Sequence, residues 1–349
     1  MFEKLYAQGE MKVVCIGGSI TEGAGARDKT NRWTTRLVKW LNTLPLGGTS
    51  FTEINAGIGG TGSDLGLLRL KRDVMNLEPD IVFLEFAVND TGIKEEASAR
   101  FYEGILYALS KMQKVPYVIC AGMVCNHNKP TRAALHKKLA ANYGLDFIDV
   151  KVGMDEQLGL AEPGVNLVRD RMFSRDNIHP SDEGYGFYFE YIKSQLSDES
   201  FKRPIPIVQG EDFCKFTGRF INAYEMECEG DWNEVGEGDW NQENYGRKGS
   251  GMLTTTAEGV LRCRFNGTAY MLCHRIGRDY GKMVVTLDGV SKEMDLYYET
   301  DNQPVSWFNS FELEDKEHVL EIRSLGTKNE KSTDTKVRID SVIVPVYTE

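Results

Sequence analysis

Ser19 stands where a serine hydroxyl can act as a nucleophile. It follows an apolar, β-branched run at residues 11–16 and two glycines, Gly17 and Gly18. Such a run is typical of a short buried strand, and glycine lets the chain turn sharply after it. The turn would present the hydroxyl at the carboxyl end of a parallel sheet, where α/β folds place their chemistry. The order differs from the Gly-x-Ser-x-Gly elbow and from the Gly-x-Gly-x-x-Gly dinucleotide loop.

A carboxylate and an imidazole occur together much later, in the segment Asp176-Asn-Ile-His179. In a tight loop, residues three apart can place the carboxylate against Nδ1 of the histidine. A neutral imidazole can take the proton of an attacking hydroxyl, and a carboxylate on its other nitrogen fixes the tautomer. The alternative is a solvated aspartate and a surface histidine before a helix, and the spacing alone leaves both open.

Donors for a developing oxyanion follow two further strand-like runs. A glycine run at residues 57–62 comes after residues 52–55, and Asn89 comes after the apolar run 81–86. A backbone N–H at a glycine and an asparagine amide are groups that can form an oxyanion hole. With the serine, the histidine and the aspartate, the chain holds the groups that ester hydrolysis needs.

These segments belong to a region, from Lys12 to about residue 196, in which strand and helix patterns alternate. Further strands are predicted at residues 116–120 and 147–150. Helices are predicted at residues 33–41, 63–77, 97–112, 131–143 and 181–196. The alternation predicts an α/β domain whose parallel sheet is covered by helices on both faces. The loops that carry the polar groups would then meet at the carboxyl edge of one sheet.

The pattern changes near residues 197–206, which resemble a linker. Beyond them, short strand patterns alternate with Gly, Asn and Asp turns, as at residues 259–267, 282–289 and 337–345. This predicts an antiparallel β-sandwich. The sequence therefore predicts two domains, at residues 1–200 and 205–349.

Composition limits the partners. The formal net charge is −11 at pH 7, and a surface of that sign repels nucleic acid and anionic lipid. No apolar run approaches the roughly 18 residues of a membrane span, and no apolar signal segment stands at the start. The seven cysteines lack metal or Cys-x-x-Cys spacing, which favours reduced thiols. We expect a cytoplasmic protein without nucleic-acid or membrane partners, and a homodimer is left open.

No metal or other cofactor is predicted. The acidic stretch 225–239 lacks the spacing of an EF-hand, and we interpret it as a solvated face.

Together the polar segments resemble the motifs of the SGNH/GDSL hydrolase family, in the same order and spacing, over roughly residues 11–196. The matching blocks are Gly17-Gly18-Ser19-Ile20-Thr21, Asn55-Ala-Gly-Ile-Gly-Gly-Thr61, Val88-Asn89-Asp90 and Asp176-Asn-Ile-His179-Pro180. The resemblance implies a flavodoxin-like, three-layer domain. It also implies that Ser19 is the nucleophile, that His179 is the general base and then the acid, and that Asp176 orients it.

The same resemblance implies an oxyanion hole made by the Ser19 and Gly60 backbone N–H groups and the Asn89 amide. Gly59 is the alternative to Gly60, because alignment of a glycine run can slip by one residue. The chain departs from the family at two positions. Gly18 stands where aspartate is usual, which leaves open what supports the turn, and Val88 stands where glycine is usual.

The order of a hydrolase domain and a β-sandwich resembles bacterial carbohydrate O-acetylesterases, in particular carbohydrate esterase family 17, whose sandwich (a jelly-roll) is like a carbohydrate-binding module. The resemblance implies a serine esterase that removes acetyl groups from manno- or xylo-oligosaccharides. Aromatic side chains in turn-rich segments are the predicted sugar-binding residues, with packing between domains as the alternative. They are Trp232, Trp240 and Trp307.

Two other functions stay open. One is an SGNH lipase, lysophospholipase or thioesterase, which would need a wide apolar acyl slot. The other is a non-catalytic carbohydrate-binding protein. The sequence does not say which sugar or which hydroxyl carries the acetyl group.

Overall fold

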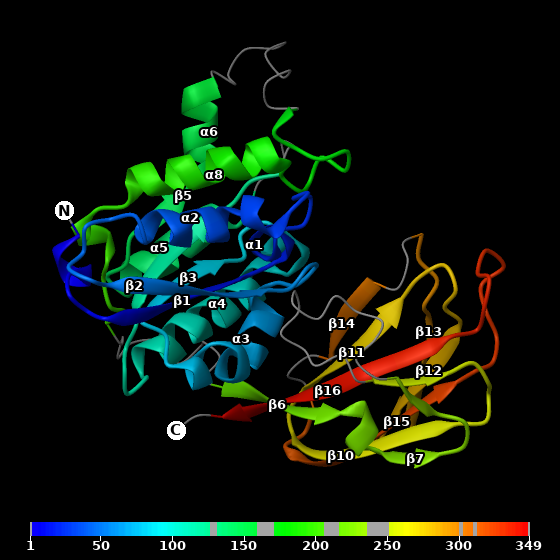
Figure 1. Cartoon of the computed structure of the whole chain (residues 1–349). Coiled ribbons are helices and arrows are strands. Elements are labelled where there is room, and N and C mark those ends of the chain that lie inside the picture. The colour runs from blue at the N-terminus through cyan, green and yellow to red at the C-terminus, as the bar shows by residue number, and fades with distance from the viewer. Residues whose placement is uncertain are drawn as a thin grey trace. The chain divides into compact units, whose positions relative to one another are not determined.

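The protein is described from a computed structural model (Figure 1). The structure describes residues 2–125, 131–158, 171–205, 216–235, 251–299, 303–309 and 313–347. The chain divides into two compact units, and the change from the first to the second lies between Lys215 and Phe216. The sequence predicted a boundary closer to the N-terminus, between residues 200 and 205.

The first unit contains a five-stranded sheet in the order β2-β1-β3-β4-β5, and each neighbouring pair is parallel. The strands are β1 (Glu10–Gly17), β2 (Ser50–Gly57), β3 (Ile81–Glu85), β4 (Tyr117–Gly122) and β5 (Phe147–Asp149). The central strand β3 is buried along its whole length, as expected for a parallel sheet with helices on both faces. The order is flavodoxin-like, so the predicted α/β fold is confirmed.

Helices lie on both faces of this sheet (Figure 1). Helices α2 and α8 contact each other on one face, and α3 and α4 contact each other on the other, with α5 beside α4. The helices are α1 (Ser19–Glu22), α2 (Trp33–Leu41), α3 (Ser63–Asp73), α4 (Glu95–Ser110), α5 (Ala133–Asn142), α6 (Val150–Leu158) and α8 (Asp182–Gln195). Among the described helices, none is both long enough and apolar enough to cross a membrane.

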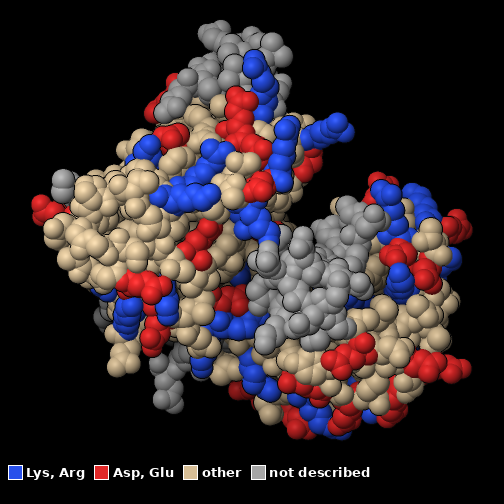
Figure 2. Space-filling view, viewed as in Figure 1, with Lys and Arg blue, Asp and Glu red and all other residues tan. Residues whose placement is uncertain are grey.

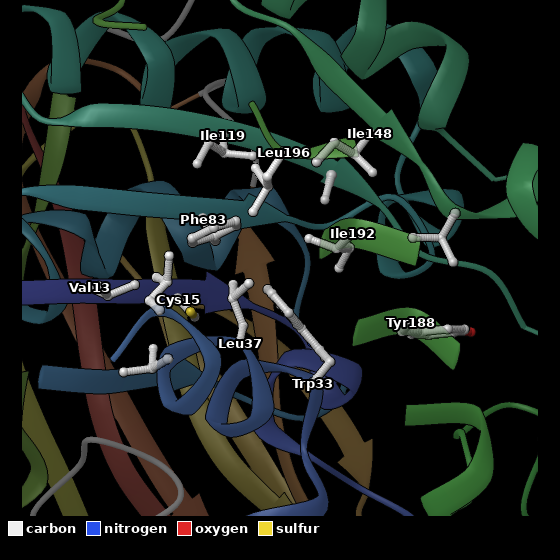
Figure 3. Packing of buried hydrophobic residues seen from close by; sticks show 14 of the residues in the cluster. Val13, Cys15, Trp33, Leu37, Phe83, Ile119, Ile148, Tyr188, Ile192 and Leu196 are labelled. Carbon is white, nitrogen blue, oxygen red and sulfur yellow. The ribbon is translucent and has the colours of Figure 1, made fainter. Parts of the chain in front are cut away.

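Figure 3 shows the packing between the sheet and the α2/α8 layer. Alternate residues of a strand face this layer, and residues four apart on each helix cover them. The side chains that meet there include Val13, Cys15 and Phe83 from the strands, Trp33 and Leu37 from α2, and Tyr188 and Ile192 from α8. Each such buried side chain stabilises the fold by about 1.5–3 kcal/mol.

The second unit consists of antiparallel strands in two sheets. One sheet has the order β13-β12-β15-β10-β7, and the other has the order β14-β11-β16-β9-β8, with β6 paired to β16. The strands are β6 (Phe216–Asn222), β7 (Glu227–Glu229), β8 (Asn233–Val235), β9 (Gly251–Thr254), β10 (Val260–Gly267), β11 (Tyr270–Ile276), β12 (Lys282–Leu287), β13 (Val290–Asp295), β14 (Gln303–Asn309), β15 (Lys316–Ser324) and β16 (Val337–Tyr347). Residues of both sheets share one buried core, among them Leu261, Leu320, Leu272 and Ile339. The predicted all-β domain is confirmed.

Basic and acidic side chains are intermingled on the face shown in Figure 2. In the second unit, opposite charges pair across neighbouring strands, as Arg262 does with Glu321 at 2.7 Å and with Glu229 at 3.2 Å. Exposed pairs of this kind contribute only about 0–1 kcal/mol each. The buried contacts therefore carry the stability of both units.

A buried arginine joins three elements at the carboxyl edge of the parallel sheet. Arg69 of α3 is fully buried, and its guanidinium donates to the carbonyl oxygens of Ala56 at 2.7 Å and Gly17 at 3.1 Å. The same group pairs with Asp73 at 3.1 Å. The ends of β1 and β2 are thereby held to one helix.

We expect Arg69→Met to lower the free energy of unfolding by about 2–4 kcal/mol, because buried carbonyl oxygens lose their donor and Asp73 loses a charge partner. Urea unfolding measures the change. The control is Lys71→Met on the same helix, whose side chain is exposed. A cost for Arg69→Met no larger than for Lys71→Met would contradict the role given to the guanidinium.

Candidate active site

Ser19 lies directly after the first strand. Strand β1 ends at Gly17, Gly18 is extended, and Ser19 begins the short helix α1. Backbone bonds close this turn, from the Glu22 N–H to the Gly18 oxygen at 3.0 Å and from the Gly23 N–H to the Ser19 oxygen at 2.9 Å. The Ser19 side chain is thereby fixed at the carboxyl edge of the sheet, with 8% of the residue exposed.

His179 lies 160 residues after Ser19 in the chain and contacts both Ser19 and Asp176. Its Nε2 lies 2.8 Å from Ser19 Oγ, and its Nδ1 lies 2.6 Å from Asp176 Oδ2. An ionised carboxylate can only accept, so Nδ1 carries the proton and Nε2 accepts from the serine hydroxyl. In this tautomer the imidazole can take the proton of the hydroxyl as the oxygen attacks a carbonyl carbon.

The loop that carries the histidine is held by its own hydrogen bonds. Asp176 Oδ1 accepts from Ser174 Oγ at 2.6 Å and from the N–H groups of Ile178 at 2.9 Å and His179 at 3.0 Å. Asn177 sits at φ 57°, a left-handed conformation that asparagine tolerates. The carboxylate and the imidazole are therefore placed by local sequence.

The same bonds set the charge of Asp176. Partial burial raises the pKa of its carboxyl, but the hydrogen bonds from Ser174, His179 and Ile178 outweigh this effect and hold the pKa well below its usual range. Asp176 is therefore ionised when His179 acts as a base, and its carboxylate can accept the hydrogen bond from Nδ1–H.

Asn89 and the glycine run flank the serine turn. Asn89 begins the 3₁₀ helix η4 (Asn89–Gly92) after β3. Its side chain lies so close to the turn that a Cβ at Gly18 would stand 2.2 Å from Asn89 Oδ1 and 3.2 Å from the Thr61 oxygen. Gly60 has φ 71°, which strongly favours glycine. The structure thus brings Ser19, the loop with Gly60 and Asn89 to one place, and the choice between Gly59 and Gly60 as the N–H donor stays a prediction.

A buried glutamate beneath the serine turn was missed from the sequence. Glu85 ends β3, is 1% exposed, and accepts from Thr21 Oγ1 at 3.2 Å. Burial raises the pKa of its carboxyl to about 7 from the ordinary 4.5, and the nearby charge of Asp90 adds to the rise. The clue in the sequence is a single charged residue that ends an otherwise apolar strand.

The tryptophans predicted to bind sugar have different outcomes. Trp232 lies in the core of the second unit with 7% of the residue exposed. A Cβ at Gly259 would come within 2.4 Å of its ring atom Cδ1, so the indole is packed closely. The expectation of an exposed stacking face is therefore wrong for Trp232. Trp240 and the side chain of Trp307 lie outside the described part of the chain.

A flavodoxin-like sheet that carries a serine, a histidine and an aspartate in one hydrogen-bonded series at its carboxyl edge is the arrangement of a hydrolase with a serine nucleophile. The chain belongs to the GDSL-like Lipase/Acylhydrolase family, whose model matches residues 15–187. The resemblance to SGNH/GDSL enzymes is confirmed, and the protein is a carboxylic ester hydrolase. In the described part of the chain, no group of three or more His, Cys, Asp or Glu side chains is arranged to hold a metal ion.

Two solved structures resemble the whole chain. One is a two-domain esterase (CEX) active on acetylated mannans, with a TM-score of 0.77, 20% identity, and coverage of 97% of this chain and 92% of that one. The other is the same esterase co-crystallised with mannopentaose, with a TM-score of 0.79, 20% identity, and coverage of 99% and 93%. At this identity the likeness shows the two-domain fold.

A curated relative matches a shorter part. The "Uncharacterized lipoprotein YqeF" of Bacillus subtilis (strain 168) is 30% identical over 115 residues, which are 31% of this chain and 45% of that protein. The chain thus spans less than half of that relative's length. The cytoplasmic location expected from the sequence stays a prediction.

The raised pKa of Glu85 predicts a pH-dependent stability. The folded state binds this proton more tightly than the unfolded state. The contribution of Glu85 to stability is therefore greatest below pH 4.5 and falls by about 3 kcal/mol as pH rises from 4.5 to above 7. Glu85→Gln should remove this slope. Urea unfolding from pH 4.5 to 8 measures it, with the exposed Glu96→Gln on α4 as the control. Equal slopes in all three proteins would contradict the prediction.

Proposed function

We propose that the protein is a serine esterase that removes O-acetyl groups from oligosaccharides. The observation that carries the proposal is the unbroken series from Ser19 Oγ through His179 to Asp176, with steps of 2.8 and 2.6 Å. Hydrogen-bonded contact between nucleophile and base, and between base and orienting carboxylate, is the arrangement that acyl transfer requires.

In the proposed reaction, Ser19 Oγ attacks the acetyl carbonyl carbon while His179 Nε2 takes the hydroxyl proton. The negative charge that develops on the carbonyl oxygen accepts hydrogen bonds from the Ser19 N–H, the Gly60 N–H and the Asn89 amide. His179 then gives the proton to the sugar oxygen, which leaves as a hydroxyl. Water then attacks the acetyl-enzyme while His179 takes its proton. As the bond from Ser19 Oγ to the acetyl carbon breaks, His179 returns the proton to Ser19 Oγ, and acetate is released.

The substrate class rests on the relatives and on charge. The two-domain fold extends over nearly the whole length of an esterase active on acetylated mannans. The net charge of −11 favours a neutral ligand over an anionic one. An acetylated manno-oligosaccharide is the first substrate to test, and an acetylated xylo-oligosaccharide is the second.

The test measures acetate release from both oligosaccharides beside a chain-length series of p-nitrophenyl esters. We expect kcat/KM to be highest for acetate among the aryl esters and to be measurable on at least one sugar. A rate that rises with acyl length, and no release from sugar, would indicate a lipase or thioesterase. Sugar binding by calorimetry without any hydrolysis would indicate a carbohydrate-binding protein.

Ser19→Ala should fold normally and lose acetate release by about three to six orders of magnitude, because no acetyl-enzyme can form. Initial rates on p-nitrophenyl acetate measure the loss, and a thermal melt checks the fold. Turnover close to that of the unchanged protein would overturn the serine mechanism.

Gly18→Ala should lower kcat by about 10²–10³, because the added Cβ displaces the Asn89 amide. The matched control is Gly92→Ala, where a Cβ meets no atom within 4 Å and the chain has an ordinary φ. In an Asn89→Ala background, Gly18→Ala should have little further effect, since the clashing group is gone. Equal losses in both backgrounds would show that Gly18 does not act through Asn89.

A further inference from the structure

We propose that His136 is a positioning residue for the oxyanion side of this site and acts through the buried carboxylate of Asp90. The inference rests on the proposed function, because it concerns two of the three donors assigned there to the carbonyl oxygen, the Asn89 amide and the Gly60 N–H. His136 lies on α5 and does not touch the Ser19–His179–Asp176 series.

Asp90 receives four hydrogen bonds although none of its side chain is exposed. Oδ1 accepts from the Ser63 N–H at 2.7 Å. Oδ2 accepts from Ser63 Oγ at 2.7 Å, from Ser98 Oγ at 3.0 Å and from His136 Nε2 at 3.0 Å. The donors come from three helices, α3, α4 and α5. A buried carboxylate is tolerated only when it is satisfied in this way, so its position is strongly fixed.

This carboxylate connects two of the three predicted oxyanion donors, the Asn89 amide and the Gly60 N–H. Asp90 is the direct neighbour of Asn89 in the chain. Ser63 begins α3 and follows the loop that contains Gly60, so the bonds from Ser63 tie that loop to the same carboxylate. A Cβ at Gly62 would lie 2.6 Å from Asp90 Oδ1, which shows how closely the loop approaches. A shift of Asp90 would therefore move the Asn89 amide and the Gly60 N–H relative to each other.

His136 contacts the Asp90 carboxylate from helix α5, with its Nε2 3.0 Å from Oδ2. Both side chains are fully buried. The imidazole stacks on Tyr102, with 3.7 Å between ring centroids and 8° between planes. Its Nδ1 has no hydrogen-bond partner among the described residues. The ring is therefore best satisfied as the neutral tautomer with the proton on Nε2, which donates to the carboxylate.

Arg132, at the start of α5, also forms hydrogen bonds with the segment around Asn89. The Arg132 N–H donates to the Ala87 oxygen at 2.8 Å, and the Arg132 guanidinium donates to the Ile93 oxygen at 3.1 Å. The start of α5 is thus hydrogen-bonded to both ends of the segment 87–93, and His136 of the same helix contacts Asp90 in the middle of that segment. These contacts fix the position of α5 relative to the Asp90 carboxylate.

Loss of the Nε2 donor should weaken the transition state more than substrate binding, since the oxyanion forms only as the bond is made. We expect His136→Leu to lower kcat on p-nitrophenyl acetate about tenfold to a hundredfold with little change in KM. His136→Gln places an amide donor near the position of Nε2 and should restore most of kcat. Leu139→Ala, a buried change on the same helix, should leave kcat nearly unchanged even where it lowers the melting temperature.

A second pair of variants tests the network if His136→Leu does not fold. Ser98→Ala removes another donor to Asp90 Oδ2 and should lower kcat severalfold. Ser110→Ala on the same helix removes a hydroxyl whose partner among the described residues is the nearby Tyr107 oxygen, at 2.7 Å, and it should not lower kcat. Equal kcat in these two variants would overturn the inference.

Coupling to Asn89 separates positioning from a general loss of stability. In an Asn89→Ala background, His136→Leu, or Ser98→Ala in its place, should cost much less than in the unchanged protein. Additive losses would overturn the inference while the proposed function stands. Turnover that survives Ser19→Ala would instead overturn the proposed function itself, so the two failures are distinguishable.

Discussion

The register of three parallel strands is the constraint on which the site depends. Gly17 at the end of β1 lies opposite Gly57 at the end of β2 and opposite Glu85 at the end of β3. Because the three strands end level, the serine turn, the glycine loop and the Asn89 segment begin side by side. A slip of one residue in either pairing would send the apolar side chains to the wrong face of the sheet. The packing of both helical layers therefore also fixes the chemistry at the edge.

The two sides of the site are held in place by different kinds of interaction. The loop with Asp176 and His179 is partly exposed and is shaped by hydrogen bonds between residues close in sequence. The side with Asn89 is shaped by a buried carboxylate that receives donors from three helices. Local bonds to water-accessible groups contribute modestly, whereas a buried carboxylate that loses donors is costly. Changes in the core should therefore reach the site through Asn89 rather than through His179.

The sequence predicted an α/β domain with a parallel sheet. It also predicted that Ser19, Asn89 and His179 would meet at one edge of that sheet, because each belongs to a short local pattern. Helix α6 was not predicted, because it begins directly after β5. Asp149 both ends that strand and accepts from the Lys151 N–H at 3.1 Å as the N-cap of the helix. The roles of His136 and Arg69 were not predicted, because the Asp90 carboxylate and the Gly17 carbonyl oxygen that they contact are distant from them in the chain. Trp232 was misjudged because its Gly-Asp-Trp-Asn segment has the composition of an exposed turn. The core that the two sheets share, which no local pattern reveals, buries its indole.

Position 18, where the family usually has aspartate, is glycine in this chain, and the Asn89 side chain lies against it. The turn does not need a side chain there, because the Gly18 and Ser19 carbonyl oxygens already accept the N–H groups of the following turn. The space that a side chain would fill is taken by the Asn89 side chain, 2.2 Å from the position of a Cβ. Glycine at 18 and the close approach of Asn89 are therefore one feature. It follows that an aspartate could be accepted at position 18 of this chain only if the Asn89 side chain moved away from the serine turn.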